Sequence, residues 1–189
     1  MVEMTGFEQA DVPALFAAQL QSTADLFTWA ALAIPDERRY VRPARPTEEW
    51  SAARHVFHMG IYEREVALPS MRLWLGGPPV EDSLFLHEDD LWASEGQAIS
   101  YDDLLASFRE VRAEQIALLP QLRAVWGETR RTVWYIEGLP PITPQWVIGK
   151  TLQHTAEHAG ELLRFVLFWD FSEYAAAAAS NQGAMSTEE

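Results

Sequence analysis

Apolar residues recur at intervals of three and four along four long stretches of this chain, and prolines lie between the stretches. This spacing is typical of amphipathic α-helices, whereas proline disrupts a helix interior because it lacks a backbone N–H and clashes with the preceding turn. The stretches cover approximately residues 7–34, 47–68, 100–125 and 144–174. We therefore expect an all-α protein, a four-helix bundle, with a long connection at 70–100 between the second and third helices.

The chain of 189 residues is long enough for a single domain with its own apolar core. We predict that this domain spans residues 1–174. The segment 175–189 begins with a run of alanines and ends in small and polar residues. We expect a flexible C-terminal tail there.

The composition excludes several classes of function. The chain has no cysteine, which rules out disulfides, thiolate metal sites, iron–sulfur clusters and a cysteine nucleophile. Acidic residues outnumber basic ones 28 to 14, and the formal net charge is −14. A chain this acidic is repelled by nucleic-acid phosphates and by anionic lipid surfaces, so we expect neither nucleic acid nor a membrane as a partner.

Targeting signals are not evident in the sequence. The first residues lack the cationic and apolar regions of a signal peptide, and no apolar run reaches the roughly 18 residues of a membrane span. These observations predict a soluble cytoplasmic protein.

Two histidines four residues apart lie within the last predicted helix. His154 and His158 are separated by about 40° of rotation and about 6 Å of rise, so both imidazoles occupy one helix face. Glu161 follows one turn later, over His154. Neutral imidazoles at this spacing can share one metal ion, although such a pair is more often incidental. A metal site requires a third ligand from elsewhere in the chain.

The remaining histidines limit the choice of that ligand. His87 lies in the acidic part of the long connection, where we expect it at the surface. His55 and His58 lie three residues apart on the second predicted helix and face the same general direction. One or both would complete a three-histidine set with open positions, as in metal sites that activate a nucleophile. The alternative is that these histidines are ordinary core residues.

The order of these residues resembles that of the DinB/YfiT-like family. The resemblance covers most of the chain, from the first helix to about Trp169, and its motifs fall on the second and fourth helices. They are Trp50-Ser51, His58 eight residues after the tryptophan, and His154-x-x-x-His158-x-Gly160-Glu161.

The resemblance implies a fold and a metal site. The family fold is a four-helix bundle with up-down-down-up topology, often found as a homodimer. Its metal is divalent, reported as nickel, zinc or iron, and is bound by one histidine of the second helix and the pair near the last. Carried over to this chain, the ligands would be His58, His154 and His158.

Two residues near these ligands have open roles. The family motif assigns no role to His55. This residue would position a ligand histidine without binding the metal itself, contact a substrate, or simply be buried. Glu161 would orient a ligand histidine or a bound water, which makes it our candidate catalytic residue. The alternative for Glu161 is a hydrogen-bonded helix residue.

The resemblance also implies an activity. Family members of known activity include S-transferases that use bacillithiol or mycothiol, and a maleylpyruvate isomerase. We therefore predict a metal-dependent enzyme, a hydrolase or a low-molecular-weight-thiol transferase, that acts on a small molecule. The alternative is a non-catalytic helical bundle that binds a metal or a small ligand without turnover.

Two further features bear on this prediction. The only basic cluster is either a solvated loop or a clamp for an anionic group; it consists of Arg38, Arg39, Arg42 and Arg45. The side of the last helix opposite the histidines is also apolar and must be covered by the long connection or by a second subunit. We predict a homodimer.

Overall fold

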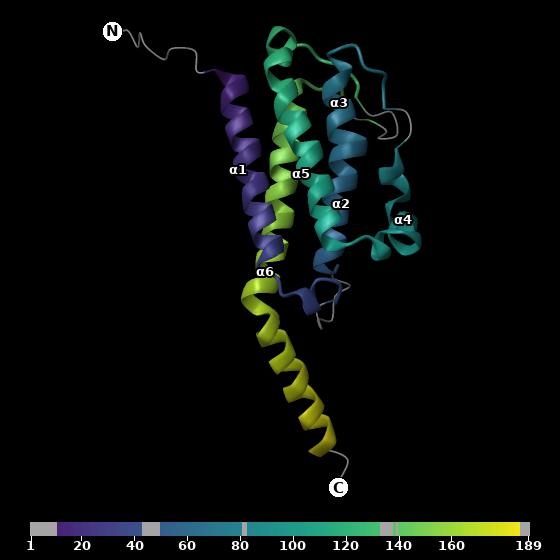
Figure 1. Ribbon diagram of the computed structural model, residues 1–189, viewed down its shortest axis with the longest axis vertical. Coiled ribbons are helices and arrows are strands. Elements are labelled where there is room, and N and C mark those ends of the chain that lie inside the picture. Colours follow the sequence, from purple (N-terminus) through teal and green to yellow (C-terminus); the bar gives the residue numbers. More distant parts are fainter. Residues whose placement is uncertain (1–10, 43–49, 81–82, 133–137, 139, 186–189) are drawn as a thin grey trace, which may run out of the picture.

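The computed structural model describes residues 11–42, 50–80, 83–132, 138 and 140–185, with side chains described as far as Trp169. Four long helical segments lie side by side in it (Figure 1). They are α1 (Val12–Leu32), α2 (Ala52–Tyr62) with its continuation α3 (Leu68–Leu73), α5 (Tyr101–Leu118) and α6 (Pro144–Met185). Across the described ranges there is no strand, and Arg130 and Ile142 form an isolated antiparallel bridge.

The directions of the four helices give the expected up-down-down-up topology. In Figure 1, α1 and α6 run down the bundle, whereas α2 and α5 run up it. Because α2 and α5 are parallel neighbours, the chain must return along the whole bundle between them. The long connection predicted at 70–100 makes this return, and the four-helix bundle is confirmed.

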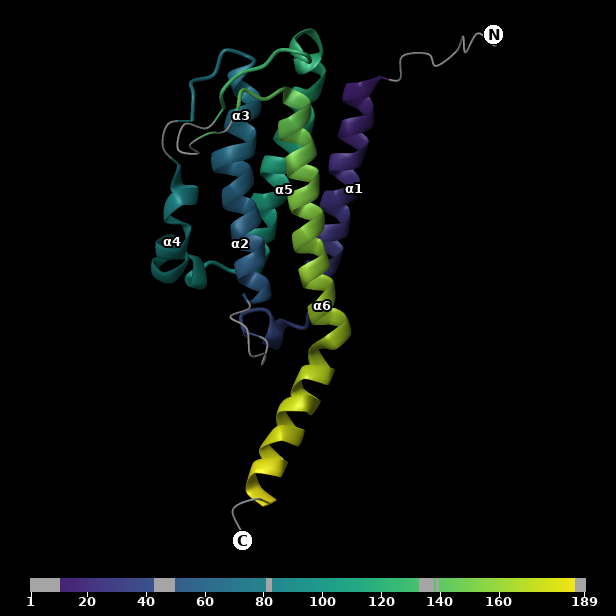
Figure 2. The ribbon, with the colours of Figure 1, turned by 180° about the vertical axis from the view of Figure 1, so that it is seen from behind.

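The returning segment is itself folded. Its described residues form three short helical elements, namely η3 (Leu84–His87), α4 (Glu88–Ser94) and η4 (Gly96–Ala98). Figures 1 and 2 show α4 beside α2, on the flank of the bundle away from α1. This segment, residues 80–99, is called the crossover below.

The second helix continues past Pro69, so the predicted end at residue 68 is wrong. Between α2 and α3 the backbone forms a π-helical turn, η2 (Glu63–Ala67), in which the Leu68 N–H donates to the Glu63 carbonyl. Pro69 has no N–H for the carbonyl four residues earlier, and the Ser83 hydroxyl donates to that Glu65 oxygen instead, at 3.4 Å. A contact from the crossover thus compensates for the proline.

The helix ends follow from capping residues. Ser51 caps the second helix, and its hydroxyl accepts from the Arg54 N–H at 3.3 Å. The predicted start of the last helix is confirmed, because α6 begins at Pro144 and the Thr143 hydroxyl accepts from the Trp146 N–H. α5 ends at Leu118, before the 3₁₀ segment η5 (Leu119–Val125) that contains Pro120.

The last helix is longer than the bundle. α6 runs to Met185, and its final turns extend beyond the other helices in both ribbon views. The helix therefore continues through most of the segment predicted to be a tail, while the domain boundary at residue 174 stays a prediction. No helix within the described part of the chain is both long and apolar enough to cross a membrane.

Two apolar clusters fill the bundle, one in each half. The lower cluster includes Phe27, Met59 and Phe108, and the upper one includes Leu20, Met71 and Ile148. Between them the helices contribute buried polar side chains rather than apolar ones. They include Arg112, at 1% exposure, and Glu63 and Gln115, both at 0%.

Candidate metal centre

The histidines of α2 and α6 meet inside the bundle. His58 Nε2 lies 2.8 Å from His154 Nε2, and His55 Nδ1 lies 2.8 Å from His158 Nδ1. His58, His154 and His158 each offer a ring nitrogen, and these three nitrogens lie within 4.8 Å of one another. The i, i+4 pair on α6 and one histidine of α2 thus converge, while His55 lies behind His158. These four residues are called the histidine cluster below.

Burial lowers the basicity of these imidazoles. Desolvation, followed by the neighbouring His158 and His58, lowers the pKa of His55 from 6.5 to about 3. Desolvation, followed by His158 and His58, lowers the pKa of His154 to about 3. Desolvation, followed by His58, lowers the pKa of His158 to about 4. These three imidazoles are therefore neutral at pH 7, and each neutral ring keeps one lone pair for a cation.

A buried carboxylate fixes the orientation of His58. Glu88, the first residue of α4, accepts a hydrogen bond from His58 Nδ1 at 2.7 Å. An ionised carboxylate can only accept, so Nδ1 carries the proton and the lone pair of neutral His58 is on Nε2, facing His154. A carboxylate behind a ligand histidine is the usual support of an imidazole that binds a metal.

Glu88 is held in turn by Arg54. Arg54 Nη2 lies 2.6 Å from Glu88 Oε1 and 2.7 Å from the exposed Asp89 carboxylate. The guanidinium is packed over the ring of Trp50, with its carbon 4.8 Å from the ring centroid. α2 therefore supplies both the histidine and the arginine that position the carboxylate of α4.

Aromatic rings enclose the histidine cluster. The Trp50 ring lies parallel to His158, at 6° and 6.0 Å between centroids, and also contacts His58 at 4.9 Å. Tyr62 packs on His154 at 4.4 Å, and Phe85 of the crossover packs on His58 at 5.5 Å. These rings shield the cluster from water on several sides, while His154 and His158 stay half-buried.

The other predicted residues are placed elsewhere. Glu161 is half-buried, and its carboxylate lies 3.0 Å from Arg164 Nη1 on the same helix, so its catalytic role stays a prediction. His87 is exposed, as expected. Glu157 is also exposed, with its carboxylate 3.9 Å from His154 Nδ1.

The basic cluster is partly committed to structure. Arg39 pairs with Asp36 at 2.8 Å, donates to the Ile34 carbonyl and stacks on the Tyr101 ring at 4.6 Å. Arg38 lies over the ring of Trp169 at 5.2 Å. Arg42 is exposed, and Arg45 lies outside the described residues.

Sequence reasoning missed Glu88 and Arg54. Glu88 is one of three consecutive acidic residues in a segment that reads as a solvated surface, and nothing local marks it as buried. One signal was the position of Arg54, one turn before His58 on a helix whose other residues there are apolar or histidine. A charge on such a helix needs a buried partner.

The comparisons with known proteins agree with this fold. The family model of the DinB superfamily matches residues 19–162. Among solved structures, YfiT from Bacillus subtilis is described as a probable metal-dependent hydrolase with an unusual four-helix bundle topology. It is 18% identical, with a TM-score of 0.64 over 87% of this chain and 91% of YfiT.

At this identity the likeness to YfiT concerns the fold alone. No curated protein sequence is similar enough to count as a match. The family model spans well over half of the chain, and the matched range contains all four residues of the histidine cluster. On this evidence, the chain belongs to the DinB superfamily.

Proposed function

We propose that the protein is a metal-dependent hydrolase of small molecules, with a divalent metal held by His58, His154 and His158. The observation that carries this proposal is the convergence of three ring nitrogens, from two helices, within 4.8 Å of one another. When bound, a divalent metal supplies Lewis-acid chemistry and lowers the pKa of a water or thiol beside it.

The residues present fit such an ion. Imidazole is a common ligand of zinc, nickel and iron, and the lowered pKa values of His154 and His158 keep these rings unprotonated at neutral pH. Glu88 directs the lone pair of His58 toward His154. In the proposed site, His55 holds the ring of His158 through the contact between their Nδ1 atoms.

The surroundings of the cluster suit chemistry on a small molecule. Trp50, Tyr62 and Phe85 exclude water from three sides, which strengthens electrostatic interactions inside. Half-buried His154 and His158 leave a side through which a small substrate can approach. Three protein ligands leave further positions on a metal for substrate and water, as in hydrolytic metal sites.

The experiment that tests this proposal is elemental analysis of the untagged protein by plasma mass spectrometry. We expect about one divalent metal per chain in the wild type. The variants His58→Ala and His154→Ala should lose it. Absence of metal after dialysis against nickel, zinc, manganese and iron would overturn the proposal and favour a small-ligand-binding bundle.

A thiol transferase remains a prediction drawn from the family resemblance. The acidic net charge and the engagement of Arg39 in structure leave few cations for the carboxylates of a low-molecular-weight thiol. A screen of the metal-loaded protein with ester, amide and thiol-acceptor substrates distinguishes hydrolysis from transfer. Turnover that requires the thiol would replace the hydrolase with the transferase.

The homodimer also remains a prediction. Support comes from large apolar side chains at the surface of α1 and α6. Trp29 is 59% exposed and Leu167 is 61% exposed. Light scattering that gives one species of 21.4 kDa at high concentration would contradict a dimer.

A further inference from the structure

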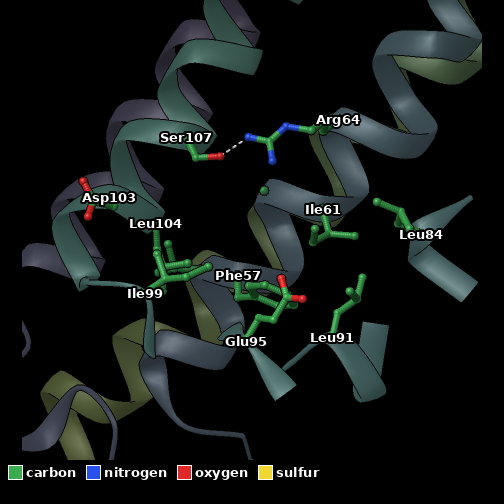
Figure 3. Close-up of a pocket in the computed structure, with 12 residues that line it drawn as sticks. Phe57, Ile61, Arg64, Leu84, Leu91, Glu95, Ile99, Asp103, Leu104 and Ser107 are labelled. Carbon is green, nitrogen blue, oxygen red and sulfur yellow. Dashed lines mark hydrogen bonds between the residues drawn. The ribbon is translucent and has the colours of Figure 1, made fainter. Parts of the chain in front are cut away.

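A cavity lies on the face of α2 that points away from the histidines. Gly60 lines this cavity and is two residues beyond His58, which corresponds to about 200° around the helix. The cavity is open to solvent on one side and is lined by α2, the first turn of η2, the crossover and the first turns of α5, and its volume is about 220 Å³. Figure 3 shows the residues of all three elements turned toward it.

The walls of the cavity are mostly apolar. They are formed by Val56, Phe57, Ile61, Leu84, Leu91 and Leu104. A cavity of about 150 Å³ with similar walls is large enough to bind benzene. The space here therefore admits a ring somewhat larger than benzene.

Gly60 keeps the floor of the cavity open. Glycine is among the least favourable residues in a helix interior, so its presence in α2 calls for a reason. A close helix contact is not that reason, because a Cβ at Gly60 would meet nothing nearer than Ser107 Oγ, at 3.8 Å. The missing side chain instead leaves room inside the cavity.

The lining of the cavity also includes polar groups. Arg64 of η2, just past the end of α2, donates to the Ser107 hydroxyl on α5, and Figure 3 shows this pair at one end of the cavity. Glu95 and Asp103 add two carboxylates to the lining, and Asp103 accepts from the Ser100 hydroxyl at 2.6 Å. A carboxylate ligand would meet two negative charges, and an ammonium ligand would meet the Arg64 guanidinium. An uncharged oxygen can accept from Arg64 or Ser107 without either conflict.

We propose that this cavity is a second binding site, distinct from the histidine cluster, for a small uncharged amphipathic molecule. The ligand class is an aromatic or branched aliphatic ring that carries one hydroxyl or carbonyl oxygen. The ring occupies the space over Gly60, and the oxygen lies at the Arg64–Ser107 end.

The test compares three probes with the same ring, namely benzyl alcohol, benzoate and benzylammonium. Each is titrated into the full-length protein and followed by the amide chemical shifts of Gly60 and Ser107. We expect saturable binding of benzyl alcohol and weaker binding of both charged probes. No saturable shift with the alcohol, or tighter binding of a charged probe, would overturn the proposal.

Two variants locate the ligand. Gly60→Leu fills the floor from α2, and Ser107→Leu fills the rim from α5, so each should abolish binding of benzyl alcohol. Gly149→Leu is the matched control, because it is the same substitution in the interior of another helix, α6, where a Cβ meets open space away from the cavity. Circular dichroism checks that each variant is folded. Binding that survives in both filled variants would place the ligand elsewhere.

The metal centre provides an independent control. His154→Ala should bind benzyl alcohol as the wild type does, since the cavity lies on the other face of α2. Loss of binding in His154→Ala alone would assign the probe to the histidine cluster and overturn the second site. Metal content is measured on the same samples. A failure to bind the proposed metal is therefore seen separately from a failure to bind benzyl alcohol.

Discussion

Two groups of buried polar side chains lie next to each other in the bundle, and their hydrogen bonding differs. In the first, called the Arg112 cluster, the guanidinium reaches Glu63 of η2, the Leu20 carbonyl at 2.8 Å and the Thr155 hydroxyl at 2.7 Å. Its donors thus bind acceptors on three other helical segments. The second is the histidine cluster, whose nitrogens face mainly one another.

The difference separates a structural role from a chemical one. The Arg112 guanidinium is surrounded by acceptors that need no further ligand, so the cluster ties the helices together in one register. The histidine cluster brings lone pairs of neutral rings together, which is favourable only with shared protons or a cation between them. Thr155 and His154 are neighbours in the chain, so one turn of α6 serves both purposes.

The largest effect is expected from breaking the Arg112 cluster. Arg112→Met leaves Glu63 buried without its cation and should lower the free energy of unfolding by about 3–5 kcal/mol. Urea denaturation of the metal-free protein measures this loss. The double variant Arg112→Met/Glu63→Leu should recover most of the stability, because it removes both charges. A loss below about 1 kcal/mol in the single variant would show that the cluster has no structural role.

The next effect concerns the support of the histidines. Glu88→Gln removes the charge behind His58 and should weaken metal binding by about 10–100-fold, as loss of an outer carboxylate commonly does. Competition with a chromogenic chelator measures the affinity. Asp89→Asn is the matched control, since Asp89 also pairs with Arg54 but is exposed and does not touch a histidine. Equal losses in the two variants would contradict a specific role for Glu88.

The two clusters should also respond to pH with opposite sign. The pKa of His154 is about 3 in the folded protein and 6.5 unfolded, so the unfolded state binds more protons between these values. Stability is therefore complete above pH 6.5 and falls as the pH is lowered toward 3. Burial raises the pKa of Glu63, whose contribution instead falls as the pH rises through its folded pKa.

Urea denaturation of the metal-free protein at pH 7.5 and 5 tests this. We expect His154→Asn to reduce the acid-induced loss of stability by on the order of 1–2 kcal/mol. An unchanged loss in this variant would mean that His154 titrates normally in the folded protein.

The smallest effect tests whether the clusters are independent. Thr155→Val keeps the shape but removes a hydroxyl that accepts from Arg112 and donates to the Thr151 carbonyl at 2.7 Å. We expect a loss of about 1 kcal/mol in stability and no change in metal affinity. Calorimetry and the chelator assay measure the two quantities on one sample. Weakened metal binding would show that the clusters are coupled through α6.

Local patterns predicted the helices because helix formation depends on residues three and four apart. The start of α6 at Thr143-Pro144 and the end of α1 before Pro35 followed from single residues. The continuation of the second helix through Pro69 did not follow from local residues. It depends on the hydroxyl of Ser83, from the crossover, which donates to the Glu65 carbonyl. The prediction that a helix ends at a proline assumes that no distant group donates a hydrogen bond in place of the missing proline N–H.

The sequence by itself determined the four helices, the shared face of His154 and His158, and two candidates, His55 and His58, for their partner. The spacing within one helix decides each of these. Only the tertiary structure brought Glu88 behind His58, packed Arg54 against it, and put His55 rather than Glu161 beside His158. These contacts join residues on different elements, and they depend on the path of the crossover and the packing of the helices.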